Sequence, residues 1–550
     1  MRSFLLFPII VIFFFSAKIF GASTPPDPLD KPYAGGLWAL YGDGCAGLTT
    51  NDIANMANRL SFVNAHSFQP TDKFWFSDDC PKDAKGRTIK QQILALNPNF
   101  TFSNYRNGSY TNQDCIDEAA ESEQRFPMGI SVWDTKAKLT AWLNASNTNF
   151  KLTRSIAPPS GVTEQFYPFK ESKTTAIYSV DKNQYVSWVR IEDEIMRINS
   201  VSWDGTNIVM DVTRGIWGTT AASHTISTRV MAPVYIGSVK SGADTSLSGV
   251  PDNGSPQMGI RYAYYQQDTN FQTWLGDKAQ HYFDKGCDVT WLDVTASTNY
   301  NTGDAYGQAR DPWDYESGAA VSATRYMNYQ QQKINALYAR FPDKKFFVNN
   351  VKGESYFPYE KRFLTGENAS GQKVNHPVDG GCMEYYVGDT ETGWHQDVDM
   401  TLDMVANQFW TIAWAKGGTA QYRKYAYATY LLAYAPGCKV VFGSEFGIRA
   451  NVDSYFYYDL GNPIETYTNS TQATNGSLPV GIYQRHFSKG MVLVNVKSTT
   501  ATVALTQALF DVDSSTFVNS VDIAGKAGKI LLKSKEDMQS FANPAWGHYN

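Results

Sequence analysis

The stretch CDVTWLDVT, from Cys287 to Thr295, decides the fold. It is rich in β-branched and aromatic residues, which predicts a buried strand, and it carries one carboxylate, Asp293, near its C-terminal end. The run before it, NFQTWLGDKAQHYFDKG (270–286), predicts a helix that stops at a glycine. A helix followed by a buried strand that ends in an acid is typical of a (β/α)8 barrel, where functional groups lie at the carboxyl ends of the strands.

Other strand candidates extend the same pattern along the chain. KKFFVNN (344–350) ends in Asn349 and Asn350, and GCMEYYVG (381–388) carries Glu384. Helical and strand patterns alternate elsewhere, which predicts a parallel sheet wrapped by helices, an α/β fold of the (β/α)8 TIM-barrel class. The expected strands are 36–44, 61–68, 99–110, 260–265, 288–294, 345–350, 382–388 and 439–446, and one more is expected near Trp410 to Trp414.

Two regions lose the helical period and predict β-structure of a different kind. Residues 174–245 contain short alternating runs and an Asp204-Gly205 hairpin signal, so we expect a small β-module inserted in the barrel. Its acids, Glu192 to Glu194, are assigned to a solvated hairpin. We expect a C-terminal β-sandwich over 450–550, with the two parts of the barrel at 23–173 and 246–449.

The first 22 residues read as a secretory signal peptide. Arg2 precedes an apolar run that is too short for a membrane span, and small residues follow. We therefore expect a secreted, extracellular monomer with no stable membrane span and with N-glycans on some of its seven Asn-Xaa-Ser/Thr sites. Six cysteines remain after the signal; Cys80 and Cys115 are plausible disulfide partners, and Cys287 and Cys382 are expected to be buried thiols.

Composition narrows the classes of partner. The net charge is −5 and no basic cluster occurs, so nucleic acid is not an expected partner. No phosphate-binding loop, zinc spacing or Ser/His/Asp motif is present, and we expect no metal and no organic cofactor. Aromatic residues make up 14% of the chain, which suits carbohydrate binding as well as it suits a large core.

The candidate chemistry is that of paired carboxylates. Hydrolysis of a glycosidic bond needs one carboxyl group to protonate the leaving oxygen and another to attack the sugar or activate water. Asp293 and Glu384 are the candidates, since an acid in an apolar strand is costly unless it faces a polar cavity. The candidate substrate-binding residues are Asp43, Tyr105, Asp268, Asn349, Asn350, Tyr385 and Glu445.

At these residues the chain resembles a known group of enzymes. VTWLDVT, FFVNN and CMEYYVG are similar to the fourth, fifth and sixth barrel-strand ends of secreted glycosyl hydrolases related to endo-α-1,4-polygalactosaminidases, and more widely to the α-galactosidase superfamily. The resemblance covers about residues 36–170 and 259–500. It implies that Asp293 is the nucleophile and Glu384 the general acid/base of a retaining enzyme.

Two other functions remain open on the sequence. A catalytically inactive carbohydrate-binding protein on the same barrel would keep the aromatic residues and tolerate loss of either acid. A structural cell-surface glycoprotein would depend on the two β-modules. Convergence of the Asp293 and Glu384 carboxyl groups on one place would favour the hydrolase.

Overall fold

The structure is a computed structural model of the chain. The residues that it describes are 34–37, 48–59, 62–65, 80, 82–98, 100–109, 116–158, 160, 163–171, 187–236, 262–293, 302–303, 310–349, 351, 357–368, 370–384, 386–388, 390–415, 419–445, 455, 458–469, 471–472 and 478–541. The signal-peptide segment and Cys115 lie outside these residues. Cys287 and Cys382 are buried thiols, as expected.

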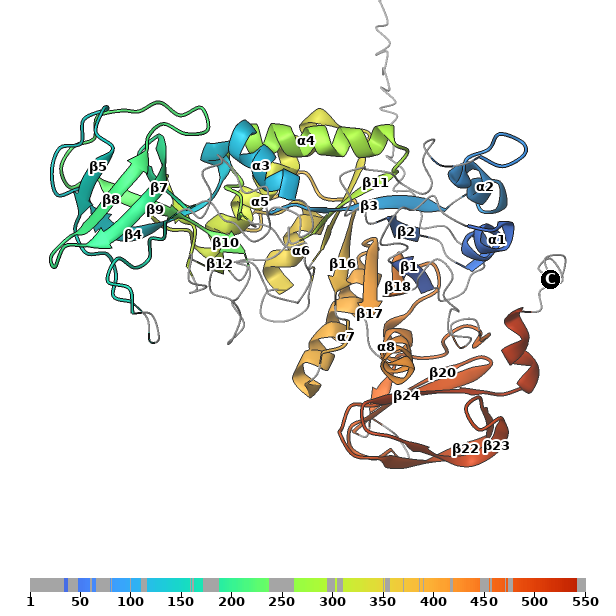
Figure 1. Cartoon of the computed structure of the whole chain (residues 1–550). Coiled ribbons are helices and arrows are strands. Elements are labelled where there is room, and N and C mark those ends of the chain that lie inside the picture. The colour runs from blue at the N-terminus through green and yellow to red at the C-terminus, as the bar shows by residue number, and fades with distance from the viewer. Residues whose placement is uncertain are drawn as a thin grey trace, which may run out of the picture.

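An eight-stranded parallel sheet forms the centre of the molecule (Figure 1). Its order is β1-β18-β17-β16-β15-β11-β3-β2, so the first strand pairs with the last and the sheet is strongly curled. β1 and β2 lie side by side, although the described residues contain no ladder between them. The expected α/β class, with a curled parallel sheet, is confirmed. The strands are β1 (Ala34–Leu37), β2 (Phe62–Ala65), β3 (Thr101–Asn107), β11 (Val289–Asp293), β15 (Lys345–Asn349), β16 (Gly380–Glu384), β17 (Thr411–Ala415) and β18 (Val440–Glu445).

Helices connect successive strands of this sheet. Local sequence sets where they begin: Thr88 and Gln91 form a capping box at α2, and Ser322, Thr390 and Thr419 cap α5, α7 and α8. α6 was not anticipated, and β17 is the strand that we expected near Trp410 to Trp414. The helices are α1 (Thr50–Arg59), α2 (Ile89–Leu96), α3 (Ile116–Arg125), α4 (Thr269–Asp284), α5 (Ala323–Arg340), α6 (Phe357–Thr365), α7 (Glu391–Ala406) and α8 (Ala420–Ala433).

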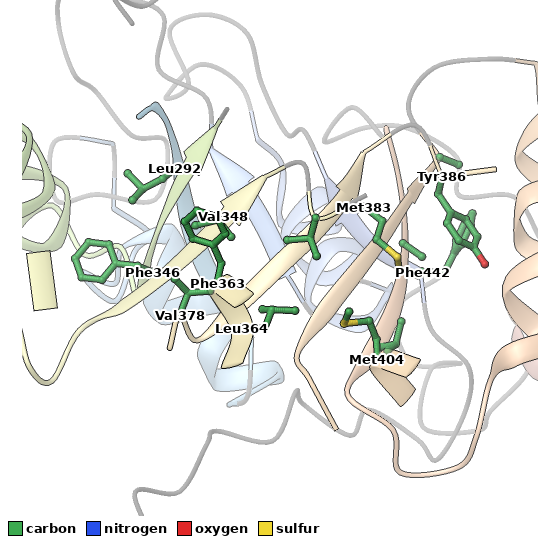
Figure 2. Packing of buried hydrophobic residues seen from close by; sticks show 14 of the residues in the cluster. Leu292, Phe346, Val348, Phe363, Leu364, Val378, Met383, Tyr386, Met404 and Phe442 are labelled. Carbon is green, nitrogen blue, oxygen red and sulfur yellow. The ribbon is translucent and has the colours of Figure 1, made fainter. Parts of the chain in front are cut away.

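Both faces of the parallel strands are apolar because both are buried. Successive side chains of a strand point to opposite faces. One set packs against the helices, and Figure 2 shows Leu292, Val348, Met383 and Phe442 of this set beside α6 and α7. The alternate set forms a separate cluster enclosed by the curled sheet: Phe62, Val289, Trp291, Phe347, Cys382, Trp410, Ile412 and Trp414.

A six-stranded antiparallel sheet interrupts the chain between α3 and α4, and it lies at one side of the parallel sheet (Figure 1). It also includes β4 and β5, which the sequence analysis assigned to the first part of the barrel. Those segments have the alternating burial of half-buried strands, and they pair with β9 and β8. The order is β4 (Val132–Lys138), β9 (Arg229–Pro233), β6 (Trp188–Ile191), β7 (Glu194–Trp203), β8 (Ile208–Thr213) and β5 (Asn149–Leu152).

Two sequence expectations about this region are wrong. Residues 262–264 of the segment 260–265 form no strand of the parallel sheet: Tyr262 and Tyr264 make isolated antiparallel bridges to Tyr235 and Ile130, because their rings fill the junction between the two sheets. Glu194 is not solvated, since its carboxylate is buried and bonded to the Arg214 guanidinium.

The C-terminal region is one continuous antiparallel sheet that folds back on itself (Figure 1). β22 and β23 lie across β20, β21 and β24, and an apolar cluster fills the space between the two layers. α8 of the parallel-sheet unit packs against β24 and β21. The strands are β19 (Thr468–Asn469), β20 (Ile482–Phe487), β21 (Gly490–Asn495), β22 (Ala501–Asp511), β23 (Thr516–Ile523) and β24 (Ala527–Leu532).

The layer between the sheet and the helices predicts a stability difference between two leucines. Leu292 is fully buried and Leu96, on α2, is 41% exposed. We expect Leu292→Ala to lower the free energy of unfolding by about 2–5 kcal/mol, because it leaves a cavity, and Leu96→Ala to cost less than about 1 kcal/mol. Urea unfolding followed by circular dichroism measures both. Equal costs for the two variants would contradict the assigned face of β11.

Candidate active site

Three polar residues lie at the carboxyl ends of three adjacent strands. Asp293, Asn349 and Glu384 are the last residues of β11, β15 and β16, the fourth, fifth and sixth strands of the parallel sheet in chain order. Each follows a member of the enclosed apolar cluster by two positions, after Trp291, Phe347 and Cys382 respectively. The strand period of two therefore places the three polar groups on the enclosed face, one layer above the cluster.

One amide nitrogen joins the two acids. Asn349 Nδ2 donates to Asp293 Oδ1 at 2.6 Å and also to Glu384 Oε2. The Tyr105 hydroxyl, from β3, donates to the other oxygen of Asp293. Since each hydrogen bond is ~3 Å long or shorter, the two carboxylate oxygens on Asn349 are at most about 6 Å apart. The structure thus brings four of the residues selected from the sequence into one hydrogen-bonded group.

The two acids keep a small contact with solvent that the residues two positions before them lack. Asp293 and Glu384 are each 7% exposed, whereas Trp291 and Cys382 are 1% and 0% exposed. The layer beneath is closed by aromatic packing, including an edge-on contact between Trp291 and Trp414 with ring centroids 6.1 Å apart. Access to the acids is therefore from the carboxyl ends of the strands.

Two donors hold the carboxyl group of Asp293. Tyr105 and Asn349 each donate to one of its oxygens. The same two bonds fix the plane of the carboxylate group. Asp293 is thus held in one orientation with one face toward the open end of the sheet.

A second set of contacts supports the backbone at Asp293. The Gly108 amide, just after β3, donates to the Asp293 carbonyl at 3.0 Å, and Lys333 Nζ of α5 donates to the Gly108 carbonyl. Gln330, one turn earlier on α5, donates to Ser109 Oγ at 2.8 Å. Lys333 is completely buried, and burial lowers its pKa well below the ordinary value for lysine.

Sequence analysis did not select Lys333, although a signal for it exists. On α5, Lys333 lies on one buried face together with Tyr326, Gln330 and Leu337. These residues recur every three or four positions, the spacing of a helix face that packs on a core. A lysine on such a stripe is unusual, since lysine is rarely fully buried. That pattern indicates that the amino group of Lys333 has a hydrogen-bonding partner in the core.

The inserted sheet contacts the chain segment that follows Asp293. β12 (Thr302–Gly303) pairs with β10 (Tyr235–Ile236) of the insertion. Further along, the Arg310 guanidinium lies over the Trp133 ring at 4.6 Å, and Arg190 lies over Tyr315 at 4.4 Å. Such cation–π contacts are each worth ~0.5–2 kcal/mol. The insertion therefore holds the connection between β11 and α5 at the open end of the parallel sheet.

The remaining residues selected from the sequence fall outside this group or outside the described side chains. Asp268 caps α4, where its carboxylate accepts from the Phe271 amide at 2.7 Å, and no described contact links it to Asp293. Burial raises the pKa of Asp268. Glu445 ends β18, in register with Leu37, but its side chain is not described. Asp43, Asn350 and Tyr385 lie outside the described residues.

The described residues include neither a candidate metal site nor a candidate membrane-spanning helix. Within them, no group of three or more His, Cys, Asp or Glu residues is placed to hold a metal ion. The helices that the structure describes include none that is both long and apolar enough to cross a membrane.

Comparisons with known proteins give weak structural similarity to glycoside hydrolases. No family model and no curated protein matches the sequence. A family GH13_31 enzyme matches with a TM-score of 0.38 and 9% identity over 92% of this chain and 98% of the other. The isomalto-dextranase of Arthrobacter globiformis matches with a TM-score of 0.34 and 8% identity, over 93% of this chain and 75% of the other. A GH27 β-L-arabinopyranosidase from Geobacillus stearothermophilus matches with a TM-score of 0.34 and 9% identity, over 92% of this chain and 98% of the other. With TM-scores below 0.5, these similarities carry no argument about the reaction, which must come from the site.

The shared amide of Asn349 predicts a pH-dependent loss of stability when it is replaced by a carboxyl group. In Asn349→Asp the new carboxyl would lie buried beside two others, so its folded pKa would exceed its unfolded value near ~3.9. Between those values the native state binds more protons than the unfolded state, so the free energy of unfolding falls as pH rises. A shift of two units corresponds to about 2.7 kcal/mol over the whole titration, of which about 2 kcal/mol is lost between pH ~4 and pH ~8.

Asn349→Leu is the matched control for this prediction, because it removes the amide without adding a charge. Its loss of stability should also grow with pH, because the two carboxyl groups lose a shared donor, but it should grow less than in Asn349→Asp, which adds a third acid. Urea unfolding of the parent and both variants at pH 4, 6 and 8 gives the comparison. A pH-independent loss in Asn349→Asp would show that position 349 is not close to both acids.

Proposed function

We propose that this protein is a glycoside hydrolase that cleaves an extracellular polysaccharide or oligosaccharide with Asp293 and Glu384. The observation that carries the proposal is the single amide nitrogen of Asn349, which bonds both carboxylates at the open end of a curled parallel sheet. Paired carboxylates on strand ends of this kind are the usual apparatus for cleaving a glycosidic bond. A structural salt bridge would instead place a cation between them.

The separation of the two acids supports a retaining mechanism. Retaining glycosidases hold their carboxyl groups ~5–5.5 Å apart, and inverting ones ~6.5–9.5 Å apart to admit a water molecule. Two oxygens bonded to one nitrogen are at most about 6 Å apart. Oxygens this close are nearer to the retaining range than to the inverting one, so direct attack by a carboxylate is favoured.

In the proposed reaction Asp293 is the nucleophile. Its carboxylate oxygen forms a bond to the anomeric carbon while Glu384 gives its proton to the departing glycosidic oxygen, and the bond from that carbon to the oxygen breaks. Glu384 then takes a proton from water, whose oxygen attacks the anomeric carbon and releases Asp293. The donors Tyr105 and Asn349 orient the nucleophile, and Asn349 also keeps the two acids together.

Three further statements belong to this proposal. The parallel sheet closes into a complete (β/α)8 barrel, which the position of β1 between β18 and β2 supports. The domains are a parallel-sheet unit, an insertion that begins at β4 and not at residue 174, and a separate C-terminal β-unit. The protein is a secreted monomer with N-glycans, which the signal-like residues 1–22 support.

Substitution of the two acids tests the reaction. We expect Asp293→Asn to lower kcat by about 10³-fold or more on any substrate found by a polysaccharide panel, with sugar binding retained. Glu384→Gln should reduce hydrolysis of poor leaving groups by ~10²–10⁴-fold and spare activated aryl glycosides, which need no proton. Nuclear magnetic resonance of the first product shows whether the anomeric configuration is retained.

Asp343→Asn is the matched control, since Asp343 is an exposed acid just before β15. It should leave kcat unchanged. Full activity in Asp293→Asn would contradict the proposed nucleophile. Sugar binding with no turnover of any glycoside in the parent protein would instead support the inactive carbohydrate-binding protein.

Secretion predicts processing and a particular pattern of glycans. Expressed in a eukaryotic secretory host, the protein should lose about its first 22 residues. Asn144 is exposed, as are Ala145 and Ser146, so this site should be occupied. The sequence favours occupancy of Asn107 and Asn144 over Asn99, but Asn107 lies in register with Asp293, and Ser109 of its Asn-Gly-Ser site is buried. We therefore expect Asn144 to exceed Asn107 in occupancy, as mass spectrometry of glycopeptides will show; the reverse order would contradict the position given to β3.

A further inference from the structure

The inserted β-sheet carries an exposed tryptophan beside a potential glycosylation site. Trp142 is 58% exposed, although large apolar side chains are usually covered. Its indole Nε1 donates to Asn144 Oδ1 at 2.7 Å. Asn144-Ala145-Ser146 is an Asn-Xaa-Ser sequence, and all three residues are exposed. The aromatic ring and the acceptor asparagine are thus in direct contact at the surface.

The backbone around Asn144 is held rigidly from inside the insertion. The Asn147 amide donates to the Asn144 carbonyl at 3.1 Å and closes a turn. Arg214 Nη1 donates to the same carbonyl at 2.9 Å and to the Asn147 carbonyl at 2.7 Å. The guanidinium is itself fixed by two hydrogen bonds to the buried carboxylate of Glu194. The turn therefore presents Asn144 in a fixed direction.

The charge on Glu194 is well compensated. Burial opposes its ionisation, but bonds from Arg214, the Ala222 amide and His224 outweigh this and hold the pKa of Glu194 below its ordinary value. Glu194 Oε2 accepts from the Ala222 amide at 2.9 Å, and the His224 ring lies at 2.9 Å from the same oxygen. A buried ion pair with this many bonds is costly to disturb. Its effect here is to anchor the turn that carries Asn144.

We propose that Asn144 carries an N-glycan and that the first sugar of this glycan packs on the indole ring of Trp142. The hydrogen bond from Trp142 uses the amide oxygen of Asn144, and Nδ2, the atom that a glycan is attached to, makes no hydrogen bond within the described residues. Attachment of a sugar at Nδ2 therefore preserves the observed contact. The apolar face of the sugar then covers the ring that the protein leaves exposed.

The attachment is a group transfer, and it rests on the secretory route proposed above. Asn144 Nδ2 loses a proton and forms a bond to the anomeric carbon of an oligosaccharide, and the bond from that carbon to its lipid diphosphate carrier breaks. The diphosphate leaves with the electron pair. The donor is a lipid-linked oligosaccharide of the secretory pathway, and no residue of this chain acts as the catalyst.

Three variants separate the glycan from the ring in the full-length secreted protein. Ser146→Ala removes the glycan without altering Asn144 or Trp142, because the Ser146 side chain makes no hydrogen bond among the described residues. Trp142→Ala removes the ring, and the double variant removes both. Mass spectrometry gives the occupancy of each site, and differential scanning calorimetry gives Tm.

We expect the effects of Ser146→Ala and Trp142→Ala on Tm to be non-additive. Ser146→Ala should lower Tm by about 2 °C in the parent protein and have no effect in the Trp142→Ala background. Trp142→Ala should also speed the enzymatic release of the Asn144 glycan from the native protein by about three- to tenfold. Release from Asn368, a site elsewhere in the chain, should not change and serves as the internal control.

Several results would overturn the proposal. Additive Tm changes with Asn144 occupied would show that glycan and ring do not touch. An unoccupied Asn144 with other sites occupied would refute this proposal alone, whereas a secreted protein with no glycans would also refute the proposed glycoprotein character. Weaker binding of a polysaccharide substrate in Trp142→Ala, with unchanged glycan release, would show that the ring binds substrate instead.

Discussion

The amide group of Asn349 is the interaction on which the arrangement of the site depends. Its nitrogen joins the carboxylates of Asp293 and Glu384, which come from strands on either side of β15. The shared donor thus holds the two carboxyl groups together across β15. The bonds exist only in the observed register, since a slip of one residue would turn one of these side chains to the helix-facing side. The strand register that pairs β11, β15 and β16 is therefore also the register that assembles the site.

Part of this arrangement could be predicted from the sequence, and the reason is local. Buried parallel strands are apolar on both faces, so the polar residues that end them are conspicuous, and Asp293, Asn349 and Glu384 were found in that way. Contacts between distant segments have no such signal. The pairing of β4 with β9, the cap made by Asp268 and the burial of Lys333 each depend on which element packs opposite, which periodicity within a segment does not contain.

The inserted sheet is more than an appendage to the parallel sheet. β10, which follows this sheet in the chain, pairs with β12, and Arg190 and Trp133 of the sheet contact Tyr315 and Arg310 in the connection that follows Asp293. Tyr262, where the chain returns from the insertion, bonds Glu123 of α3 at 2.6 Å. Burial raises the pKa of Glu123 well above its ordinary value. The insertion and the parallel-sheet unit thus share buried side chains at this junction, so the insertion and the site have a common structural support.

The position of the insertion has a consequence for how the chain reaches its native state. The bond between Tyr105 and Asp293 joins residues 188 positions apart, and the whole inserted sheet lies between them. Contacts so distant in sequence form slowly, because a long loop must be closed before they contribute. During synthesis, β3 leaves the ribosome well before its neighbour β11, so its edge stays unpaired until β11 has been made. All strands of the antiparallel sheet are synthesised between β3 and β11. The sheet can therefore form before β11 leaves the ribosome. Its early folding would bring α3 and α4 together and shorten the effective loop, so the insertion acts as an internal template for pairing the two strands that carry Tyr105 and Asp293.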